Sequence, residues 1–281
     1  MITCNLMGGL GNQMFQIFAT ISYAIKTRNQ FKFLALGKLG GGSTTIRYTF
    51  WETFFSNLKP FLIKELPTLI CIKENGFHYN ELPLEKMMNK DIIISGYFQS
   101  YKYFESNYSI ICRLIGLDKM KETLLNKLNL ERKELENYVS IHFRLGDYKK
   151  LQDYHPLATY EYYERSLHHI AKCNPNITLN IMYFCEEEDM EDVLIKINKL
   201  KEVFPTYHFN RGDKTLEDWE QMLLMSCLHH NIIANSSFSW WGAYFNSHLD
   251  KIVCYPYVWF GECANIDTKD LCPHQWIKIS V

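Results

Sequence analysis

The residues best suited to chemistry form the run 142–148, which reads His-Phe-Arg-Leu-Gly-Asp-Tyr. It continues an apolar stretch that predicts a β-strand over Tyr138–Phe143. Because side chains alternate along a strand, His142 and Arg144 should point to the same side. A guanidinium makes forked, charge-assisted bonds to phosphate, so Arg144 is a candidate diphosphate ligand that His142 could steady. The alternative is a purely structural ion pair between Arg144 and Asp147.

A second candidate is the run 8–13, Gly-Gly-Leu-Gly-Asn-Gln, between a predicted strand and a predicted helix. Glycines let a ligand approach the backbone closely, and the free amides of a helix start attract anions. The alternative is an ordinary tight turn. The run is no dinucleotide-binding fingerprint, because Met14 occupies the third glycine position and residues 28–30 include no acid. No Gly-Lys-Ser/Thr follows, so it is no P-loop either.

A third candidate, the run 235–242, reads Asn-Ser-Ser-Phe-Ser-Trp-Trp-Gly. Its asparagine and serines at a predicted helix start supply capping hydroxyls and exposed amides, which suit a phosphate group. Trp240 and Trp241 are large and rigid, and core packing behind the loop is the expected role for Trp241.

The acidic run 185–189, Cys-Glu-Glu-Glu-Asp, follows another predicted strand. Its carboxylates could hold a ribose or a metal ion. Acids in the first turn also stabilise a helix through its dipole, and by itself this run is better explained in that way.

The elements that must position these residues alternate between strand-like and helical patterns. Alternation of this kind indicates parallel sheets flanked by helices, in which ligands bind beyond the carboxyl ends of the strands. The charged residues 129–137 mark the predicted boundary between two such units. The predicted strands span 2–7, 31–35, 92–95, 138–143, 179–184, 207–209, 231–234 and 251–255. The predicted helices span 12–28, 118–128, 159–172, 188–200, 216–228 and 237–247, and residues 38–45 are predicted to be a loop.

Bulk properties exclude several classes of protein. A chain of 281 residues with 47% hydrophobic residues buries a good core, and a net charge of -1 gives no basic field for nucleic acid. The nine cysteines follow no zinc-binding spacing and are expected to be reduced. The opening residues resemble a strand rather than a signal peptide, and no apolar run is long enough to cross a membrane. We therefore expect a cytoplasmic protein, with a peripheral place at a membrane as an alternative.

Taken together, the motifs resemble those of the α-1,2-fucosyltransferases of glycosyltransferase family 11. The runs 8–15, 142–148 and 232–243 occur in the family's order, and 96–104 and 218–226 also match. The resemblance implies an α/β, GT-B-like fold of two Rossmann-type domains whose parallel sheets face each other across a cleft. Residues 1–132 would form the acceptor-side domain, and residues 133–281 would bind GDP-fucose.

The resemblance also implies the reaction: inverting, metal-independent transfer of L-fucose from GDP-fucose to a galactoside hydroxyl in an α-1,2 linkage. No cofactor and no metal would be required. The acceptor would be a galactose-containing oligosaccharide, lipid-linked glycan or polysaccharide. In this mechanism Arg144 would hold the β-phosphate, supported by His142 and Asp147. Asp147 is also the nearest motif carboxylate to take the acceptor's proton, with an inward glutamate or the departing phosphate as alternatives.

The resemblance transfers further roles residue by residue. The catalytic side chains would be Arg144, Asp147 and Asn12. The donor pocket would be lined by His142, Arg144, Tyr148, Glu186, Asn235, Ser236, Ser237 and Ser239, with Glu186 in reach of the guanosine. The acceptor side would present Gly9, Asn12 and Gln13.

One departure from the family pattern concerns donor binding. Members usually carry two consecutive arginines in the second motif, and here the second position is Leu145. Two other functions remain as alternatives. One is a metal-dependent GT-A transferase that uses Glu186–Asp189, and the other is a glycan-binding module with Trp240, Trp241 and Tyr148 as its platform.

Overall fold

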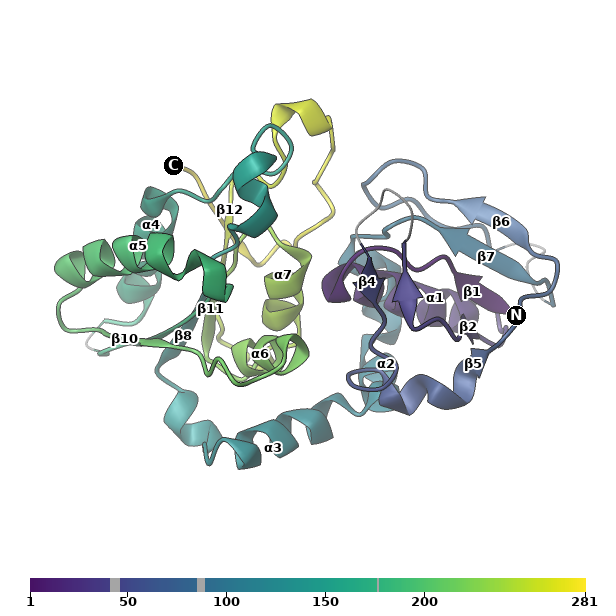
Figure 1. Cartoon of the computed structure of the whole chain (residues 1–281), viewed down its shortest axis with the longest axis horizontal. Coiled ribbons are helices and arrows are strands. Elements are labelled where there is room, and N and C mark those ends of the chain that lie inside the picture. Colours follow the sequence, from purple (N-terminus) through teal and green to yellow (C-terminus); the bar gives the residue numbers. More distant parts are fainter. Residues whose placement is uncertain (41–45, 85–88, 176) are drawn as a thin grey trace. The chain divides into compact units, whose positions relative to one another are not determined.

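The computed structural model describes residues 1–40, 46–84, 89–175 and 177–281. The chain forms two compact units (Figure 1). Unit 1 comprises Met1–Lys119 with Ile266–Pro273, and unit 2 comprises Met120–Asn265 with His274–Val281. Both are α/β with a parallel sheet, which is the architecture of the GT-B-like class predicted from the sequence.

Unit 1 is built on a parallel sheet in the order β1-β7-β6. A parallel bridge between Ile2 and Phe31 joins β1 to the parallel pair β2–β5. The strands are β1 Ile2–Cys4, β2 Phe33–Leu34, β3 Lys38–Leu39, β4 Arg47–Tyr48, β5 Leu62–Ile63, β6 Ile70–Lys73 and β7 Ile92–Ser95. The helices are α1 Leu10–Lys26, α2 Tyr108–Ile115 and the start of α3 Leu117–Lys127.

Helix α1 is more deeply buried than its pattern predicts. Phe15, Phe18 and Ile21 are fully buried, but so are polar residues on its other sides. Among them, Gln16 exchanges hydrogen bonds with the backbone of Met7, at 2.8 and 3.2 Å. The helix is therefore the centre of unit 1 rather than a surface helix with one buried face.

Unit 2 contains a six-stranded sheet in the order β10-β9-β8-β11-β12-β13, and all its neighbouring strands are parallel. The strands are β8 Tyr138–His142, β9 Asn180–Phe184, β10 His208–Arg211, β11 His230–Ile232, β12 Val253–Pro256 and β13 Ile277–Ile279. The helices are α4 Tyr160–Cys173, α5 Met190–Val203, α6 Asp218–Met225 and α7 Ser237–Tyr244. Counted along the chain, this is the strand order of a Rossmann fold.

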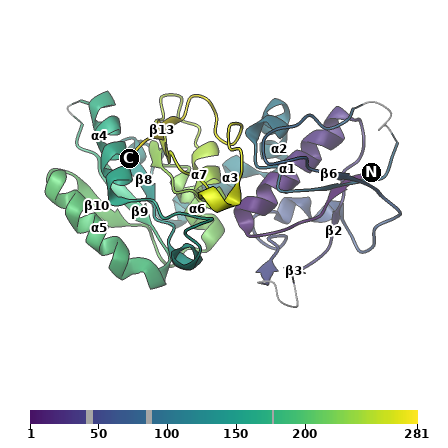
Figure 2. The same ribbon diagram turned by 90° about the horizontal axis from the view of Figure 1, so that it is seen from above.

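The helices of unit 2 cover both faces of this sheet. Helices α4 and α5 lie on one face and α6 and α7 on the other, as Figure 1 shows, and Figure 2 views the same helices from above. The hydrophobic core under α4 and α5 includes Val139, Ile141, Tyr163, Ile181 and Ile197.

The boundary between the units differs from the predicted one. The structure divides the chain between Lys119 and Met120, inside α3, rather than in the charged residues 129–137. The reason is packing: Leu124 and Leu125 are buried, and Lys127 of α3 pairs with Glu220 of α6 at 2.6 Å. The charged residues therefore belong to unit 2.

A late segment of the chain returns to unit 1. Residues 266–273 belong to this unit, which the sequence pattern did not indicate. The Ser100 hydroxyl donates to the Asp270 carbonyl at 2.6 Å, and the Asp270 carboxylate pairs with Lys102.

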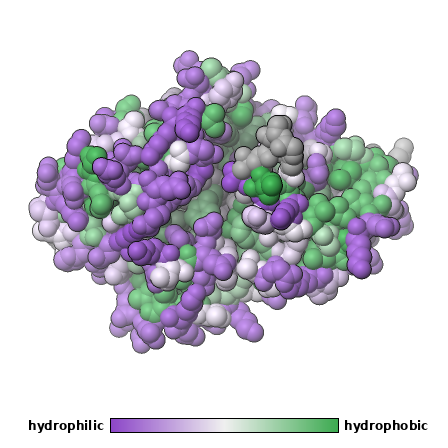
Figure 3. Space-filling view, viewed as in Figure 1, coloured by the Kyte–Doolittle hydropathy of each residue, from purple (hydrophilic) through white to green (hydrophobic). Residues whose placement is uncertain are grey.

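The space-filling view separates the surface character of the two units. On the face shown in Figure 3, hydrophilic residues dominate over unit 2, while hydrophobic residues gather over part of unit 1. Within the described parts of the chain, no helix combines the length and the apolar character needed to cross a membrane.

Candidate functional site

The predicted donor residues lie where a Rossmann sheet binds its ligands. Strands β8 and β11 are neighbours, with Ile141 paired to Ile232, and the order of the strands along the chain reverses between them. Such a reversal opens a crevice at the carboxyl ends of the two strands. The runs 142–148 and 235–242 leave β8 and β11 at this point. They are also in contact, because the Tyr148 hydroxyl donates to the Asn235 carbonyl at 3.3 Å.

The predicted alternation after β8 is confirmed. Phe143 and Leu145 are buried in the core beneath α4, and the Phe143 ring lies 4.4 Å from that of Tyr163. His142 lies on the opposite face, 5.5 Å from the Phe238 ring of α7. Leu145 thus fills an apolar position, where a charged side chain would have to be buried.

Arg144 is held by two carboxylates. It forms ion pairs with Asp147 and Glu186, and its guanidinium lies 5.0 Å from the centre of the Tyr148 ring. Burial alone would lower the pKa of Arg144, but the two carboxylates outweigh it and raise the pKa. The guanidinium is therefore charged and oriented, and the structural ion pair considered above is present.

A neighbouring turn fixes the loop that carries Arg144. Gly146 has a φ of +40°, and its amide donates to the buried Asp189 carboxylate at 2.7 Å. Lys149 pairs with the same carboxylate at 2.8 Å and with Asp192 at 2.7 Å. The sequence did not predict that Asp189 holds this loop in place through Gly146 and Lys149. The signal for it was its place just after β9, the strand beside β8.

His142 is a buried, neutral imidazole. Burial, and then the charge of Arg144, lower its pKa to about 3. Its Nδ1 atom is buried and has no hydrogen-bond partner in the described part of the chain. An imidazole with so low a pKa is uncharged at neutral pH and does not supply a proton there.

The start of α7 corrects two of the predicted donor contacts. Asn235 is buried, and its amide donates to the carbonyls of Pro156 and Trp259 at 2.9 and 3.0 Å. Ser239 is also buried, and its hydroxyl donates to the Ser236 carbonyl at 3.5 Å. Their side chains therefore build the turn rather than line an open pocket.

The remaining residues of that turn follow the carboxyl end of β11. Ser236 is the N-cap of α7, and its hydroxyl accepts from the amide of Phe238 at 3.3 Å. Ser237 and Phe238 are half-buried. Tyr148 stacks on His155, with ring centres 4.6 Å apart, and sequence reasoning did not identify His155. The start of α7, Arg144 and the stacked rings of Tyr148 and His155 thus lie close together at the carboxyl ends of β8 and β11.

Both tryptophans are core residues. Trp240 and Trp241 are fully buried, and Trp240 stacks on Tyr244 at 4.6 Å. The packing role expected for Trp241 is confirmed. The two tryptophans of the platform that the glycan-binding alternative requires are therefore not on the surface.

The acidic run after β9 is divided among separate partners. Glu186 pairs with Arg144, Glu187 with Arg211 at 2.8 Å, and Asp189 with Lys149. Over the described residues, these acids do not form a group of converging metal ligands. The arrangement favours positioning of the loops over metal binding.

The glycine run of unit 1 lies at the end of β1. Gly8 has a φ of +74°, and a Cβ added there would lie 2.4 Å from the Asn12 amide nitrogen. Gly9 is the N-cap of α1, and no other atom would lie within 4 Å of a Cβ added there. Asn12 is half-buried and accepts a hydrogen bond from Gln99 at 2.8 Å. Gly9 and Asn12 therefore combine an open backbone with an oriented amide.

Gln13 requires a correction. It is fully buried, and its amide donates to the carbonyls of Gly8 and Tyr48, each at 2.9 Å. Its Oε1 atom is buried and unpartnered among the described residues. The side chain therefore ties the glycine run to β4 instead of facing an acceptor.

Comparisons with known proteins agree with this architecture. A model of glycosyl transferase family 11 matches residues 1–279. An alpha-1,2-colitosyltransferase of Escherichia coli is 29% identical, and the alignment covers 99% of this chain and 98% of the relative. The O-antigen biosynthesis glycosyltransferase WbnK of Escherichia coli is 29% identical over 189 residues, which are 65% of this chain and 59% of the relative.

Two solved structures give weaker likenesses. The FUT1 mutant R284K of Arabidopsis thaliana with GDP has a TM-score of 0.46 at 10% identity, covering 90% of this chain and 69% of its own. POFUT1 with GDP-fucose has a TM-score of 0.46 at 10% identity, covering 90% of this chain and 96% of its own.

Proposed function

Because the chain belongs to glycosyltransferase family 11, we propose that it transfers L-fucose from GDP-fucose to the 2-hydroxyl of a galactoside, with inversion. The observation that supports this most directly is the meeting of Arg144 with the start of α7 at the carboxyl ends of β8 and β11. A cation and the N-terminus of a helix at that place suit a diphosphate.

In the proposed complex, the diphosphate replaces the two carboxylates as the partner of the Arg144 guanidinium. Phosphate offers the same forked acceptor geometry as the carboxylates of Asp147 and Glu186, which now hold that guanidinium. The amides at the start of α7 bind the same group. Glu186 then loses its ion pair with Arg144 and can contact the nucleoside. Asp147 also loses its ion pair with Arg144, and its carboxylate can take the proton of the acceptor hydroxyl.

Catalysis in this proposal is electrostatic. Departure of GDP builds negative charge on the β-phosphate, and the fixed cation and amides stabilise it without a divalent ion. His142 is neutral and buried beside Phe238. In this proposal its N–H donates a hydrogen bond to the sugar or to phosphate, and the ring adds no charge. Asn12 of unit 1 is proposed to orient the fucose and the acceptor hydroxyl.

A second candidate donor comes from the relative that aligns over nearly the whole chain. That relative is named an alpha-1,2-colitosyltransferase, and colitose is fucose without the hydroxyl at C3. Leu145, which stands where the family usually has a second arginine, does not separate the two donors, because its side chain is buried beneath α4. The glycan acceptor is proposed to be an oligosaccharide, a lipid-linked glycan or a polysaccharide.

Parallel assays with the GDP-linked forms of both sugars test the donor. Purified protein is given each donor with a β-galactoside, and the product linkage is determined by NMR. A site that hydrogen-bonds the 3-hydroxyl rejects the deoxy sugar by about 10⁴-fold or more in kcat/KM. We expect that preference for GDP-fucose, with an α-1,2 product. Preference for colitose would move the assignment to the second candidate, and turnover of neither would contradict both.

A further inference from the structure

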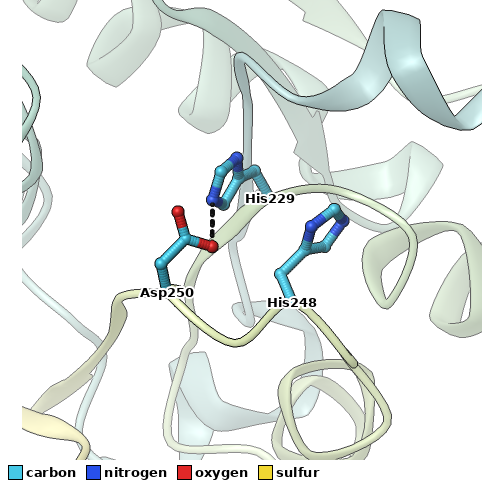
Figure 4. Close-up of side chains that lie close together, drawn as sticks. All are labelled: His229, His248 and Asp250. Atoms are coloured by element: carbon cyan, nitrogen blue, oxygen red, sulfur yellow. Dashed lines mark hydrogen bonds and ion pairs between the residues drawn. The ribbon is translucent and has the colours of Figure 1, made fainter.

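A cluster of metal-binding side chains lies at the other end of the unit 2 sheet from the donor site. His229 directly precedes β11, and Asp250 lies shortly before β12. These strands are parallel neighbours, with Asn231 paired to Val253, so the residues before them share one edge of the sheet. Figure 4 shows His229, His248 and Asp250 facing one another at this edge.

The three side chains converge closely enough to share one ion. One potential ligand atom from each lies within 4.8 Å of the others. The Nε2 atom of His229 is 3.0 Å from Asp250 Oδ1, and the rings of His229 and His248 are stacked 4.7 Å apart. Between His248 and Asp250 the Leu249 side chain is fully exposed, so it does not separate the two ligands.

The backbone orients both imidazoles. The Nδ1 atom of His229 is hydrogen-bonded to the Glu136 carbonyl, and His248 is hydrogen-bonded to the backbone of Cys227. Histidines that bind metals commonly donate their second N–H to a backbone carbonyl, which fixes the tautomer and turns the other nitrogen to the ion. For His229, this leaves Nε2 directed at Asp250, where an ion would sit.

We propose that His229, His248 and Asp250 form a structural binding site for a transition metal of the Zn²⁺ class. Two imidazoles and one carboxylate are typical zinc ligands, with water as a fourth, whereas Ca²⁺ and Mg²⁺ prefer all-oxygen sites. Asp250 is mostly exposed and His248 is half-buried, so small rotations can bring the ligands to bonding distance.

The proposed ion would act as a clip, that is, it would hold the amino ends of neighbouring strands together. Through Glu136, which lies just before β8, the cluster reaches the amino ends of three strands, β8, β11 and β12. An ion that binds only the folded state stabilises it by mass action. Because the clip lies at the edge away from Arg144, removing the ion should lower the melting temperature without abolishing transfer.

The test compares Zn²⁺ binding in the wild type and in two variants, Asp250→Asn and His248→Gln. Exposed cysteines such as Cys71 and Cys263 also bind zinc, so the informative quantity is the difference in stoichiometry. His168→Gln is the matched control, because His168 also lies beside a carboxylate, 3.9 Å from Glu164, but on the surface of α4.

We expect titration calorimetry to show one fewer Zn²⁺ per chain in Asp250→Asn and His248→Gln than in the wild type and His168→Gln. Zinc should raise the melting temperature of the wild type and of His168→Gln, but not that of Asp250→Asn or His248→Gln. Co²⁺ bound at the site should give a visible band without the near-ultraviolet charge transfer of thiolate ligands. Equal stoichiometry and equal thermal shifts in all four proteins would overturn the proposal. Asp250→Asn keeps the test valid if His248→Gln does not fold, since that side chain is mostly exposed.

Discussion

At the scale of single residues, the donor site depends on an arginine that already has partners. Arg144 is paired with Asp147 and Glu186 and packed on Tyr148. The carboxylates keep the guanidinium charged and in place while no phosphate is bound. Binding a diphosphate then exchanges one set of anionic partners for another, which costs less than ordering a free arginine.

Gly146 gives a prediction at this scale. Its φ of +40° disfavours any residue with a Cβ, and that atom would lie 2.9 Å from Glu186 Oε2. We expect Gly146→Ala to lower the free energy of unfolding by about 1–2 kcal/mol and to weaken GDP binding. Gly37→Ala is the control, because no atom would meet its Cβ and its backbone needs no glycine. It should change the stability by less than about 1 kcal/mol. Urea unfolding and GDP titration measure both effects, and equal behaviour of the two variants would contradict this account.

At the scale of elements, the regular half of the chain was predictable. Apolar runs bounded by helical periodicity located five of the six strands of the unit 2 sheet and its helices α4 to α7. The alternation of side chains at the end of β8 was also predicted, and Phe143 and Leu145 both lie in the core on the side away from His142. These predictions succeeded because period and burial are set by neighbours close in sequence.

The failures come from contacts that are distant in sequence. Asn235 was predicted to line a pocket, but the carbonyls of Pro156 and Trp259 take its amide, and no local pattern indicates them. Gln13 is bound by the carbonyl of Tyr48 in the same way. Short strands such as β5 and β13 were missed, because two or three residues carry too little alternation to detect.

The start of α1 gives a prediction that separates two adjacent residues. Asn12→Ala should reduce kcat strongly and change the GDP dissociation constant only a few-fold, because Asn12 is proposed to orient the sugar and acceptor. Gln13→Ala should instead unfold at a lower temperature, by loss of about 2 kcal/mol or more, because its buried amide holds two carbonyls. Kinetics, GDP calorimetry and thermal melts distinguish them. A large thermal shift with unchanged kcat for Asn12→Ala would make that residue structural, and equal losses of GDP binding and turnover would make the glycine run a nucleotide site.

At the scale of the whole molecule, buried histidines set the acid limit of stability. His230 accepts a hydrogen bond from the Ile252 amide through Nδ1, which requires a neutral ring. Burial, and then the charge of His229, lower the pKa of His230 to about 4. His142 behaves likewise, with a pKa of about 3. A histidine with a lowered folded pKa stabilises the fold fully above its unfolded pKa of about 6.5, and that stability is lost as the pH falls.

The free energy of unfolding should therefore decrease between about pH 6.5 and pH 4, by up to about 1.4 kcal/mol per pH unit for each histidine. Urea unfolding at a series of pH values, in EDTA to remove any bound ion, measures this slope. His230→Asn can still accept from the Ile252 amide and should show a shallower slope than the wild type. An unchanged slope would show that His230 titrates normally in the folded protein.

The proposed function depends above all on Arg144, whose forked guanidinium is proposed to bind the diphosphate of the donor in the Rossmann-type unit 2. The most direct measurement is kcat/KM for GDP-fucose in Arg144→Lys, with Arg211→Lys as the control. Arg211 pairs with Glu187 of the same acidic run, so its replacement tests a neighbouring ion pair without the proposed phosphate contact. An ammonium keeps the charge but cannot reproduce the fork. We expect Arg144→Lys to keep its melting temperature and lose about 10²–10³-fold in kcat/KM, while Arg211→Lys stays near the wild type. A folded Arg144→Lys enzyme with the kcat/KM of the wild type would contradict the account.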